Sequence, residues 1–439
     1  MIRRAILGFC VAALISGCAS SPMPTPIATP RPTASNVPRT TPPRPTTPGT
    51  VTPPIVTPPP PDFALQPARF TDIPGWANSD FAPALLAFKR QCAGWRNRTP
   101  DAPLSGGRYG GTVAQWFPAC DAATGVQPGQ EHWFFENYFD AQYVTGTGEQ
   151  RLTSYFEPVI QASRQWSPQF TEPLLSRPSD MISVDLGAFA QAFDSDALRG
   201  APRQLNGKLN GNTVVPYPKR DSITPYQGQI IGYAHPADVY NLQVQGSGRL
   251  AFNDGTQARA QFSAQNGYKW NSALGALRNS GRLTNPTWSN FRSWLDQNPS
   301  EQKNALNADP SYVFFQEEVI ADPSAGPKGG AGIPLTPMGS IAVDPAFHPY
   351  GAIVFVDGTY DNQYSFQRLL VAQDTGGAIR RGPMRGDIFA GTGPEAGAWS
   401  ERMNGPARWY TLIPKAIGAP AISSTPIASM PASAATPAG

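Results

Sequence analysis

The stretch VAQDTGGAIRRGPMRGDIFAGTGPEAG, residues 371–397, places seven glycines around two aspartates, Asp374 and Asp387, thirteen positions apart. Asp374 ends the apolar run RLLVAQ, and Asp387 lies between a glycine and the apolar pair Ile388 and Phe389. A carboxyl among glycines at the end of a strand is accessible to a ligand, because glycine lets other groups approach closely. Apolar neighbours raise the pKa of such a carboxyl by desolvation, so it can donate a proton to a leaving oxygen. The alternative is that both are ordinary turn aspartates.

The first residues, MIRRAILGFCVAALISGCAS, have the pattern of a secretory signal, which we place at residues 1–17. The apolar run from Ala5 to Ile15 is shorter than the about 20 residues that a membrane-spanning helix needs. The segment ISGC resembles the bacterial lipobox, which implies lipidation of Cys18. The alternative is an ordinary signal peptide with an incidental cysteine. By resemblance to sorted lipoproteins, Ala19 in place of Asp favours the periplasmic side of the outer membrane.

Residues 18–61 are predicted to be a linker that follows the lipidated cysteine. Sixteen of the forty residues from Pro22 to Pro61 are proline, so neither a core nor a hydrogen-bonded ladder can form there. In polyproline II geometry the forty residues reach about 120 Å. Residues 419–439 have a similar composition and are predicted to be a disordered tail.

Composition and missing motifs exclude several function classes. The 34 basic and 31 acidic residues leave a net charge of only +3, without a basic block in the body, so nucleic acid is not an expected partner. The sequence lacks a phosphate loop, HExxH, CxxC and G-x-S-x-G. The three histidines are far apart in sequence and are expected to be structural. We therefore expect no metal and no cofactor, and carboxylates are left as candidates for acid-base chemistry.

The body is predicted to begin with helices at residues 80–96 and 130–139. From residue 151 the pattern changes to short β-branched runs separated by turns, which predicts a β-rich region. Two more helices are expected within residues 269–281 and 287–299. The last 100 residues of the body return to strands joined by glycine-rich segments, as in a small β-barrel.

Two cysteines, Cys92 and Cys120, lie in the body. In an oxidising compartment they are candidates for a disulfide. The alternative is a buried thiol, because Cys92 continues a helical line of apolar residues formed by Phe81, Leu85, Phe88 and Trp95.

The stretch from Ala372 to Gly397 resembles the signature of the 3D domain, named for three aspartates, in the membrane-bound lytic transglycosylase A family. The third aspartate is Asp344 in AVDP, which we expect to be structural, since Asp-Pro starts turns. Six further blocks resemble that family in the same order: SYFEPVIQASR (154–164), VVPYPKR (214–220), LQVQGSGRLAFNDG (242–255), NGYKW (266–270), SYVFFQE (311–317) and GIPLTPMGSIAVDPAFHPYGAIVFVD (332–357).

The resemblance implies a mainly β fold with N-terminal helices. It has a double-psi β-barrel domain and a second, inserted β-rich domain, with a groove between them for a glycan strand. The expected parts are the helical start of the first domain (62–156), the inserted domain (157–318) and the C-terminal 3D barrel (319–418).

The resemblance also implies a peptidoglycan lytic exotransglycosylase, a lyase of the cell wall. Such enzymes cut the β-1,4 bond between N-acetylmuramic acid and N-acetylglucosamine and leave a 1,6-anhydro sugar. Asp387 matches the catalytic position and acts as acid and then as base, and Asp374 supports it. Glycan strands are the expected partner and the lipid gives contact with a membrane, whereas partners in wall synthesis or cell division are not specified.

Further residues are expected to contact the substrate. Those in YFEP and VQGSG, and those beside the two aspartates, are Tyr155, Glu157, Gln245, Gly246, Ser247, Gly376, Gly377 and Arg385. Glu157 is the rival for the acid, and VQGSG is alternatively a plain hairpin turn. Arg385 either meets substrate carboxylates or faces solvent, and arginines close to Asp387 would lower its pKa.

Two other functions stay open at this point. A hydrolase would use water in place of the 6-hydroxyl of the sugar. A non-catalytic wall-binding lipoprotein would keep the fold without the chemistry, although the unbroken signature around the two aspartates argues against that alternative.

Overall fold

The structure is a computed structural model that describes residues 63–104, 109–195, 198, 204–225, 229–361 and 363–417. The chain divides into two units, Met1–Pro58 and Pro59–Gly439, and all of the described residues belong to the second. The predicted signal peptide, Cys18, the linker and the tail lie outside the described residues. No helix in the described part of the chain is long and apolar enough to cross a bilayer.

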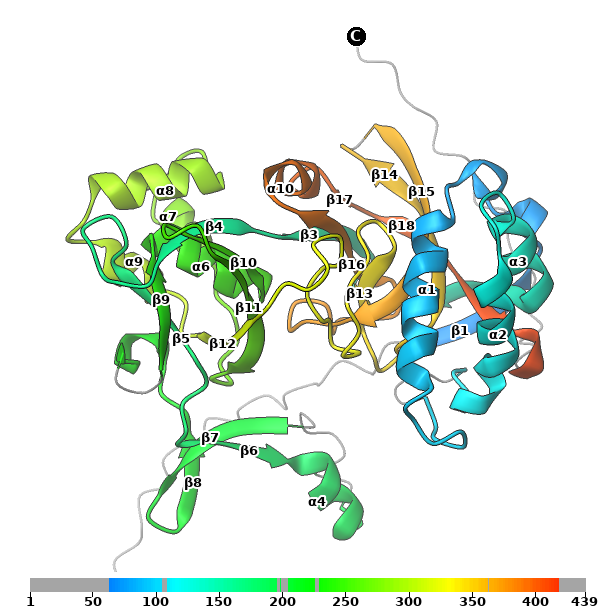
Figure 1. Cartoon of the computed structure of the whole chain (residues 1–439), viewed down its shortest axis with the longest axis horizontal. Helices are drawn as coiled ribbons and strands as arrows, with labels where there is room; N and C mark the ends of the chain where they lie inside the picture. Colours follow the sequence, from blue (N-terminus) through cyan, green and yellow to red (C-terminus); the bar gives the residue numbers. More distant parts are fainter. Residues whose placement is uncertain are drawn as a thin grey trace, which may run out of the picture. The chain divides into compact units, whose positions relative to one another are not determined.

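A nine-stranded sheet is built from strands at both ends of the body (Figure 1). Its order is β1 (Phe63–Ala68), β2 (Phe139–Gly146), β18 (Ala407–Pro414), β14 (Ile353–Tyr360), β15 (Tyr364–Asp374), β13 (Ser340–Val343), β16 (Arg385–Thr392), β3 (Arg151–Glu157) and β17 (Asn404–Gly405). The sheet curls into a nearly closed barrel. The last strand in the order, β17, comes back against β14: a Cβ built on Gly405 of β17 would lie 3.2 Å from the hydroxyl of Thr359 on β14. Ile341, Val354, Leu370, Ile388 and Trp409 belong to one buried cluster of this sheet.

Helices α1 (Ala82–Trp95), α2 (Phe117–Gly125) and α3 (Glu131–Tyr138) pack on the sheet through a second cluster. This cluster joins the predicted helical line of α1 to Phe355 and Leu369 of the sheet. The predicted helices at 80–96 and 130–139 are therefore confirmed within two residues at each end. Asp80 accepts a hydrogen bond from the backbone N–H of Ala82 at the start of α1.

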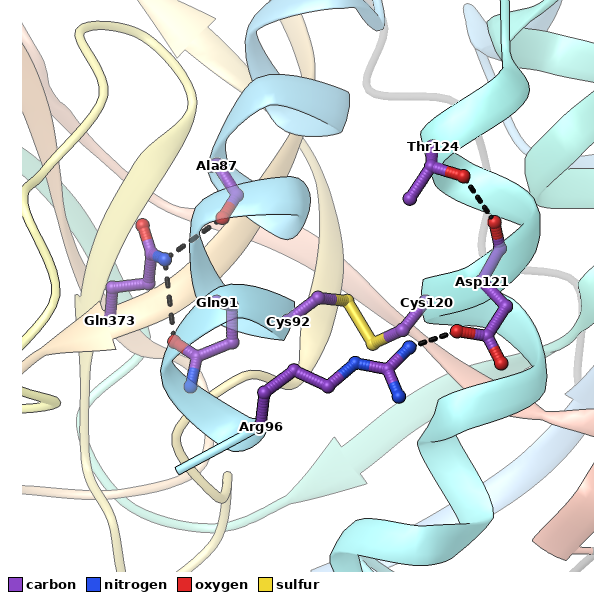
Figure 2. Close-up of a disulfide and its surroundings, with 8 residues drawn as sticks. All are labelled: Ala87, Gln91, Cys92, Arg96, Cys120, Asp121, Thr124 and Gln373. Atoms are coloured by element: carbon purple, nitrogen blue, oxygen red, sulfur yellow. Dashed lines mark hydrogen bonds and ion pairs between the residues drawn. A yellow bond between two sulfur atoms is a disulfide. The ribbon is translucent and has the colours of Figure 1, made fainter. Parts of the chain in front are cut away.

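Cys92 of α1 and Cys120 of α2 form a disulfide with a Cα–Cα distance of 5.5 Å (Figure 2). Both cysteines are buried in the core, as the helical line predicted, but the bond rules out the alternative of a buried thiol. Gln373 contacts the same helix: its side-chain amide donates to the carbonyl of Ala87 at 3.0 Å and to Oε1 of Gln91 at 3.3 Å. Helix α1, which the disulfide ties to α2, thus holds the residue that precedes Asp374.

The disulfide predicts a measurable stability difference. It closes a loop with a sequence separation of 28 residues, so loss of the bond should lower the free energy of unfolding by about 2–4 kcal/mol. The measurement is urea unfolding of the Cys92→Ala/Cys120→Ala variant against the oxidised protein. Reduction of the unsubstituted protein is the matched control and should give a similar loss. An unchanged unfolding midpoint would contradict the pairing.

A second, six-stranded sheet is drawn from the middle of the chain. Its order is β12 (Val313–Glu318), β11 (Gln257–Gln265), β10 (Gly248–Phe252), β4 (Val159–Ser163), β9 (Ile230–Ala234) and β5 (Glu172–Leu175). A separate three-stranded sheet has β6 (Met181–Asp185), β7 (Gln204–Asn210) and β8 (Thr213–Pro216), and α4 (Leu186–Ala192) follows β6. Further helices among the described residues are α6 (Pro236–Gln245), α7 (Ala273–Asn279), α8 (Trp288–Gln297), α9 (Gln302–Leu306) and, beside β16, α10 (Pro394–Ser400).

Helices α7 and α8 confirm the prediction for residues 269–281 and 287–299. The β interpretation of residues 236–245 was wrong, because this segment is helix α6. Its ends carry ordinary helix signals: Pro236 at the first position and Gly246 in the left-handed conformation, with φ 84°, as the cap. The β-branched and polar residues inside the segment hid these signals.

The joint between the two large sheets is a buried ion cluster around Glu157, which is 1% exposed. Its carboxylate accepts from Nε of Arg249 on β10 at 2.9 Å, from Nε of Arg259 on β11 at 2.6 Å, and from the hydroxyl of Thr392 on β16 at 2.7 Å. A second nitrogen of each arginine donates to backbone carbonyls between residues 323 and 325. One carboxylate therefore ties β3, β10, β11, β16 and the returning chain together.

Removal of this charge should be costly. In Glu157→Gln the two buried guanidinium groups lose their counter-charge, so we expect the free energy of unfolding to fall by about 3–5 kcal/mol. Denaturant unfolding measures the loss. The matched control is Glu317→Gln, which breaks the partly exposed pair with Arg164 and should cost less than about 1 kcal/mol. Equal effects of the two substitutions would refute a special role of the joint.

Candidate active site

Strand β13 lies between the strands that carry the two aspartates. It pairs in parallel with β15 and antiparallel with β16, and the register sets Ala342 opposite both Asp374 and Asp387. Neighbouring strands are about 4.8 Å apart, so the two aspartate Cα atoms are about 10 Å apart across the sheet. Residues thirteen positions apart in sequence thus come to one level of the sheet.

Asp387 accepts a hydrogen bond of 2.5 Å from the hydroxyl of Thr153, its register partner on β3. Burial raises the pKa of Asp387 from 3.8 to about 6, and the nearby charge of Asp374 adds to the rise. The Thr153 hydrogen bond and the charges of Arg385 and Arg151 act in the opposite direction. At a pH near 6 this carboxyl is therefore present in both the protonated and the ionised form, as acid-base catalysis requires.

Asp374 is held by three donors. The hydroxyl of Tyr155 donates at 2.6 Å, and the backbone N–H groups of Gly330 and Thr375 each donate at 2.8 Å. Burial raises the pKa of Asp374, and the three donors oppose the rise. Within the described part of the chain, no hydrogen bond joins Asp374 to Asp387. They influence each other through charge, and each has its own hydroxyl partner from β3.

Close packing fixes the strand that carries Asp387. A Cβ on Gly386 would lie 2.5 Å from the Trp409 ring and 2.8 Å from Ile341, so only glycine fits beside the acid. The other predicted glycines differ from it. A Cβ on Gly377 meets nothing within 4 Å, and one on Gly376 meets only Ile379 at 3.6 Å. Their predicted contact with a ligand is left as a prediction.

The turn before β16 is held from residues 344–348. Asp344 accepts from the backbone N–H of Ala346, which makes the expected turn, and from that of Gly382. The fully buried His348 bonds the carbonyl of Pro383 through Nε2 at 2.7 Å, so Nε2 carries the proton. Burial lowers the pKa of His348 to about 4. This histidine is structural, as expected. Its hydrogen bond to Pro383 positions the start of the strand that carries Asp387.

Several predicted contact residues have structural roles. The buried carboxylate of Glu157 is bound by Arg249 and Arg259, so it is not a rival acid. This burial also differs from its predicted place in a groove. Gln245 accepts from the backbone N–H of Phe156 at 3.3 Å, and Ser247 is buried and accepts from that of Phe262. Gly246 caps α6, so VQGSG is a helix end and not the hairpin turn that the sequence also allowed.

Arg385 is buried, which excludes the solvent-facing alternative. Its guanidinium donates to the backbone carbonyls of Arg151 and Gly386.

Thr153 is the residue that sequence analysis missed. Its signal was present, because Thr153 is two residues before Tyr155, and residues at this spacing in a strand share a face. Among the described residues, no three His, Cys, Asp or Glu side chains are grouped so as to hold a metal ion.

Comparison with known proteins identifies the family. Residues 151–316 match the MltA specific insert domain, and residues 339–412 match the 3D domain. This chain belongs to the MltA family. The insert-domain match contains β3, with Thr153 and Tyr155, and the 3D match contains both aspartates.

The curated relatives in the MltA family include membrane-bound lytic murein transglycosylase A of Vibrio cholerae serotype O1, 28% identical over 262 residues. That match covers 57% of this chain and 61% of the relative. A homolog from Buchnera aphidicola subsp. Schizaphis graminum is 23% identical over 270 residues, covering 59% of this chain and 65% of the relative. The matches thus span less than two thirds of either relative.

Solved structures in the MltA family cover more of the chain. The membrane-bound lytic murein transglycosylase of Agrobacterium tumefaciens is 28% identical, with a TM-score of 0.66, over 80% of this chain and 98% of that one. MltA from Neisseria gonorrhoeae, in its monoclinic form, is 27% identical with the same TM-score, over 80% and 93%. The predicted fold class, mainly β with N-terminal helices and two domains, is confirmed.

The raised pKa of Asp387 predicts a pH-dependent stability change. Its folded pKa, about 6, lies above the ordinary 3.8, so the ionised carboxyl destabilises the fold above about pH 6 and this cost disappears below about pH 4. Asp387→Asn should therefore stabilise the protein at about pH 7.5 by up to about 3 kcal/mol relative to its effect at about pH 4. Urea unfolding at both pH values measures this, with the exposed Asp221→Asn as control. A pH-independent effect would contradict the burial argument.

Proposed function

We propose that the protein is a lytic transglycosylase that cuts the β-1,4 bond between N-acetylmuramic acid and N-acetylglucosamine in peptidoglycan. The observation that carries the proposal is Asp387, a carboxyl with a pKa near 6, hydrogen-bonded to Thr153 and flanked by the Asp374–Tyr155 pair. The names of the curated relatives support the same reaction class. Glycan strands are the proposed partner.

In the proposed mechanism Asp387 works twice. Protonated Asp387 first donates to the oxygen that leaves with N-acetylglucosamine, and the carboxylate then removes the proton from the 6-hydroxyl of the muramic sugar. That hydroxyl attacks the anomeric carbon of its own ring and gives the 1,6-anhydro product. Because the nucleophile is tethered to the substrate, its attack is unimolecular, an advantage of up to about 7–11 kcal/mol. A second catalytic carboxyl, as other glycosidases use, is not needed.

Asp374 has a supporting role in this scheme. Its charge raises the proton affinity of Asp387, and a carboxylate on the same face stabilises the positive charge that develops on the sugar ring. Tyr155 holds Asp374 in place through its hydroxyl. Thr153 and Tyr155 are two residues apart on β3 and share a face. One strand therefore orients both carboxyls.

We also propose that Cys18 carries the lipid anchor that holds the protein on the periplasmic side of the outer membrane. The lipobox-like ISGC sequence and the proline-rich linker support this. Metabolic labelling with a tagged fatty acid tests it, because Cys18→Ser should abolish the label. Label that persists in the variant would refute the assignment.

The products of peptidoglycan digestion test the activity. Purified protein without lipid should release anhydro-muropeptides, identified by mass spectrometry, and Asp387→Asn should lower the rate by at least about a hundredfold, since it removes the acid and the base. The exposed Asp221→Asn is the control and should keep the wild-type rate. Hydrated products would indicate a hydrolase, and binding without any product would indicate a wall-binding protein.

The pH profile tests the role of Thr153. Because the first step needs protonated Asp387, the rate should fall as the pH rises above about 6. The Thr153 hydrogen bond stabilises the ionised form, so Thr153→Val should move this alkaline limb to higher pH, whereas Thr153→Ser keeps a hydroxyl and should move it less. An unshifted limb in Thr153→Val would mean that another group controls it.

A further inference from the structure

Two arginines face each other beside the proposed acid. Arg385 on β16 and Arg151 on β3 are register partners in the parallel pairing of these strands, two residues before the pair Asp387 and Thr153. Like charges directly opposite each other on neighbouring strands destabilise a sheet. The fold therefore keeps a repulsive arrangement at this position, and the repulsion is relieved only where negative charge is supplied.

The chain supplies little negative charge here. Among the described residues, Glu149 is the carboxylate that forms ion pairs with three arginines: Arg381 at 3.3 Å, Arg151 at 3.8 Å and Arg385 at 4.0 Å. Asp387 adds the other nearby negative charge that acts on Arg385. Nε of the buried Arg385 has no hydrogen-bond partner among the residues that the structure describes, and its 4.0 Å distance to Glu149 is too long for a hydrogen bond. Buried polar groups are normally paired, so an orphan guanidinium nitrogen in this cluster indicates a missing acceptor.

Two of the three arginines are accessible, and Arg151 and Arg385 lie on the face of the reaction. The side chains of Arg151 and Arg381 are 49% and 56% exposed. Residues two apart on a strand share a face, so Arg385 lies with Asp387 and Arg151 lies with Thr153. The Thr153 to Asp387 hydrogen bond shows that these two faces are the same one. At about 3.3 Å per residue, the arginine pair is about 7 Å along the strands from the acid.

We propose that Arg151, Arg381 and Arg385 form a subsite for a carboxylate of the muramic side arm, next to the bond that is cut. The inference rests on the proposed function and adds a substrate feature to it. Arginine binds carboxylates with two parallel hydrogen bonds, which suits this ligand. The carboxylate has two possible sources: the lactyl group of a peptide-free strand, or the peptide stem of a substituted strand.

Substrate binding at this subsite also assists the acid. The charges of Arg385 and Arg151 lower the pKa of Asp387 in the free protein. A bound carboxylate offsets these charges, and the proton affinity of Asp387 then rises. Binding of the anionic glycan strand thus favours protonated Asp387 when the leaving oxygen of the substrate needs a proton.

The test compares glycan strands with free carboxylates and the same strands after amidation of those carboxylates. The readout is the ratio of kcat/KM for the free strand to kcat/KM for the amidated strand. Wild type should have a ratio well above one. Arg151→Gln and Arg381→Gln should each lower this ratio about three- to tenfold, the usual net contribution of one hydrogen bond, and Arg381→Lys should restore part of it. If a substitution changes the pKa or position of Asp387, kcat/KM changes equally for both substrates, and this effect cancels in the ratio.

The control is Arg282→Gln, which removes an arginine paired with Glu301 and exposed to a similar degree, and should leave the ratio as in wild type. Peptide-free and peptide-bearing strands are tested separately, and the source of the carboxylate is the strand type on which the ratio falls. A wild-type ratio near one on both strand types, or arginine variants with the wild-type ratio, would overturn the subsite.

Failure of the proposed function gives a different result. If wild type cuts no strand, the transglycosylase proposal fails. The subsite is then decided by calorimetric binding of the same strands, in which free carboxylates should bind more tightly in wild type than in Arg151→Gln. Equal binding of free and amidated strands would overturn the subsite in that case as well.

Discussion

The buried carboxylate of Glu157 is the constraint on which the active-site face depends. Thr153, Tyr155 and Glu157 are every second residue of β3, so all three side chains point to one side of the strand. The first two hold Asp387 and Asp374. The third is fixed by Arg249 and Arg259 of the other large sheet. A slip of β3 by one residue would reverse all three side chains and separate each of them from its partner. The ion cluster thus sets the register that the chemistry needs.

The proposed acid and the histidine behind it place opposite demands on stability. Buried Asp387 is tolerated best when protonated, and buried His348 when neutral. Its pKa of about 4 lies below the ordinary 6.5, so His348 stabilises the native state less as the pH falls from about 6.5 to about 4. Asp387 destabilises it more as the pH rises from about 4 to about 6. The two effects oppose each other over the interval in which the acid must exchange its proton.

Much of this site was readable from the sequence because its signals are local. An apolar run ended by Asp374, and glycine beside Asp387, identified the two carboxyls, and the helical line that includes Cys92 identified α1. The partners were not readable. Arg249 and Arg259 are separated from Glu157 by 92 and 102 residues, and no pattern within one strand reveals such a pairing. The helix α6 was missed because its composition resembles a strand, and only its ends carry helix signals. Burial of Ser247 and Arg385 follows from tertiary packing.

The topology of the nine-stranded sheet also orders the events of folding. The hydroxyl of Thr153 and the carboxyl of Asp387 are 234 residues apart, and the whole inserted sheet lies between them in sequence. β3 can pair with β16 only after the chain has been made as far as Thr392. Such long-range pairing carries a high loop-closure entropy and forms slowly. A chain that is still being synthesised, or one that ends before β16, contains β3 with Thr153 and Tyr155 but lacks Asp387. The reaction centre is therefore assembled only when β3 and β16 pair.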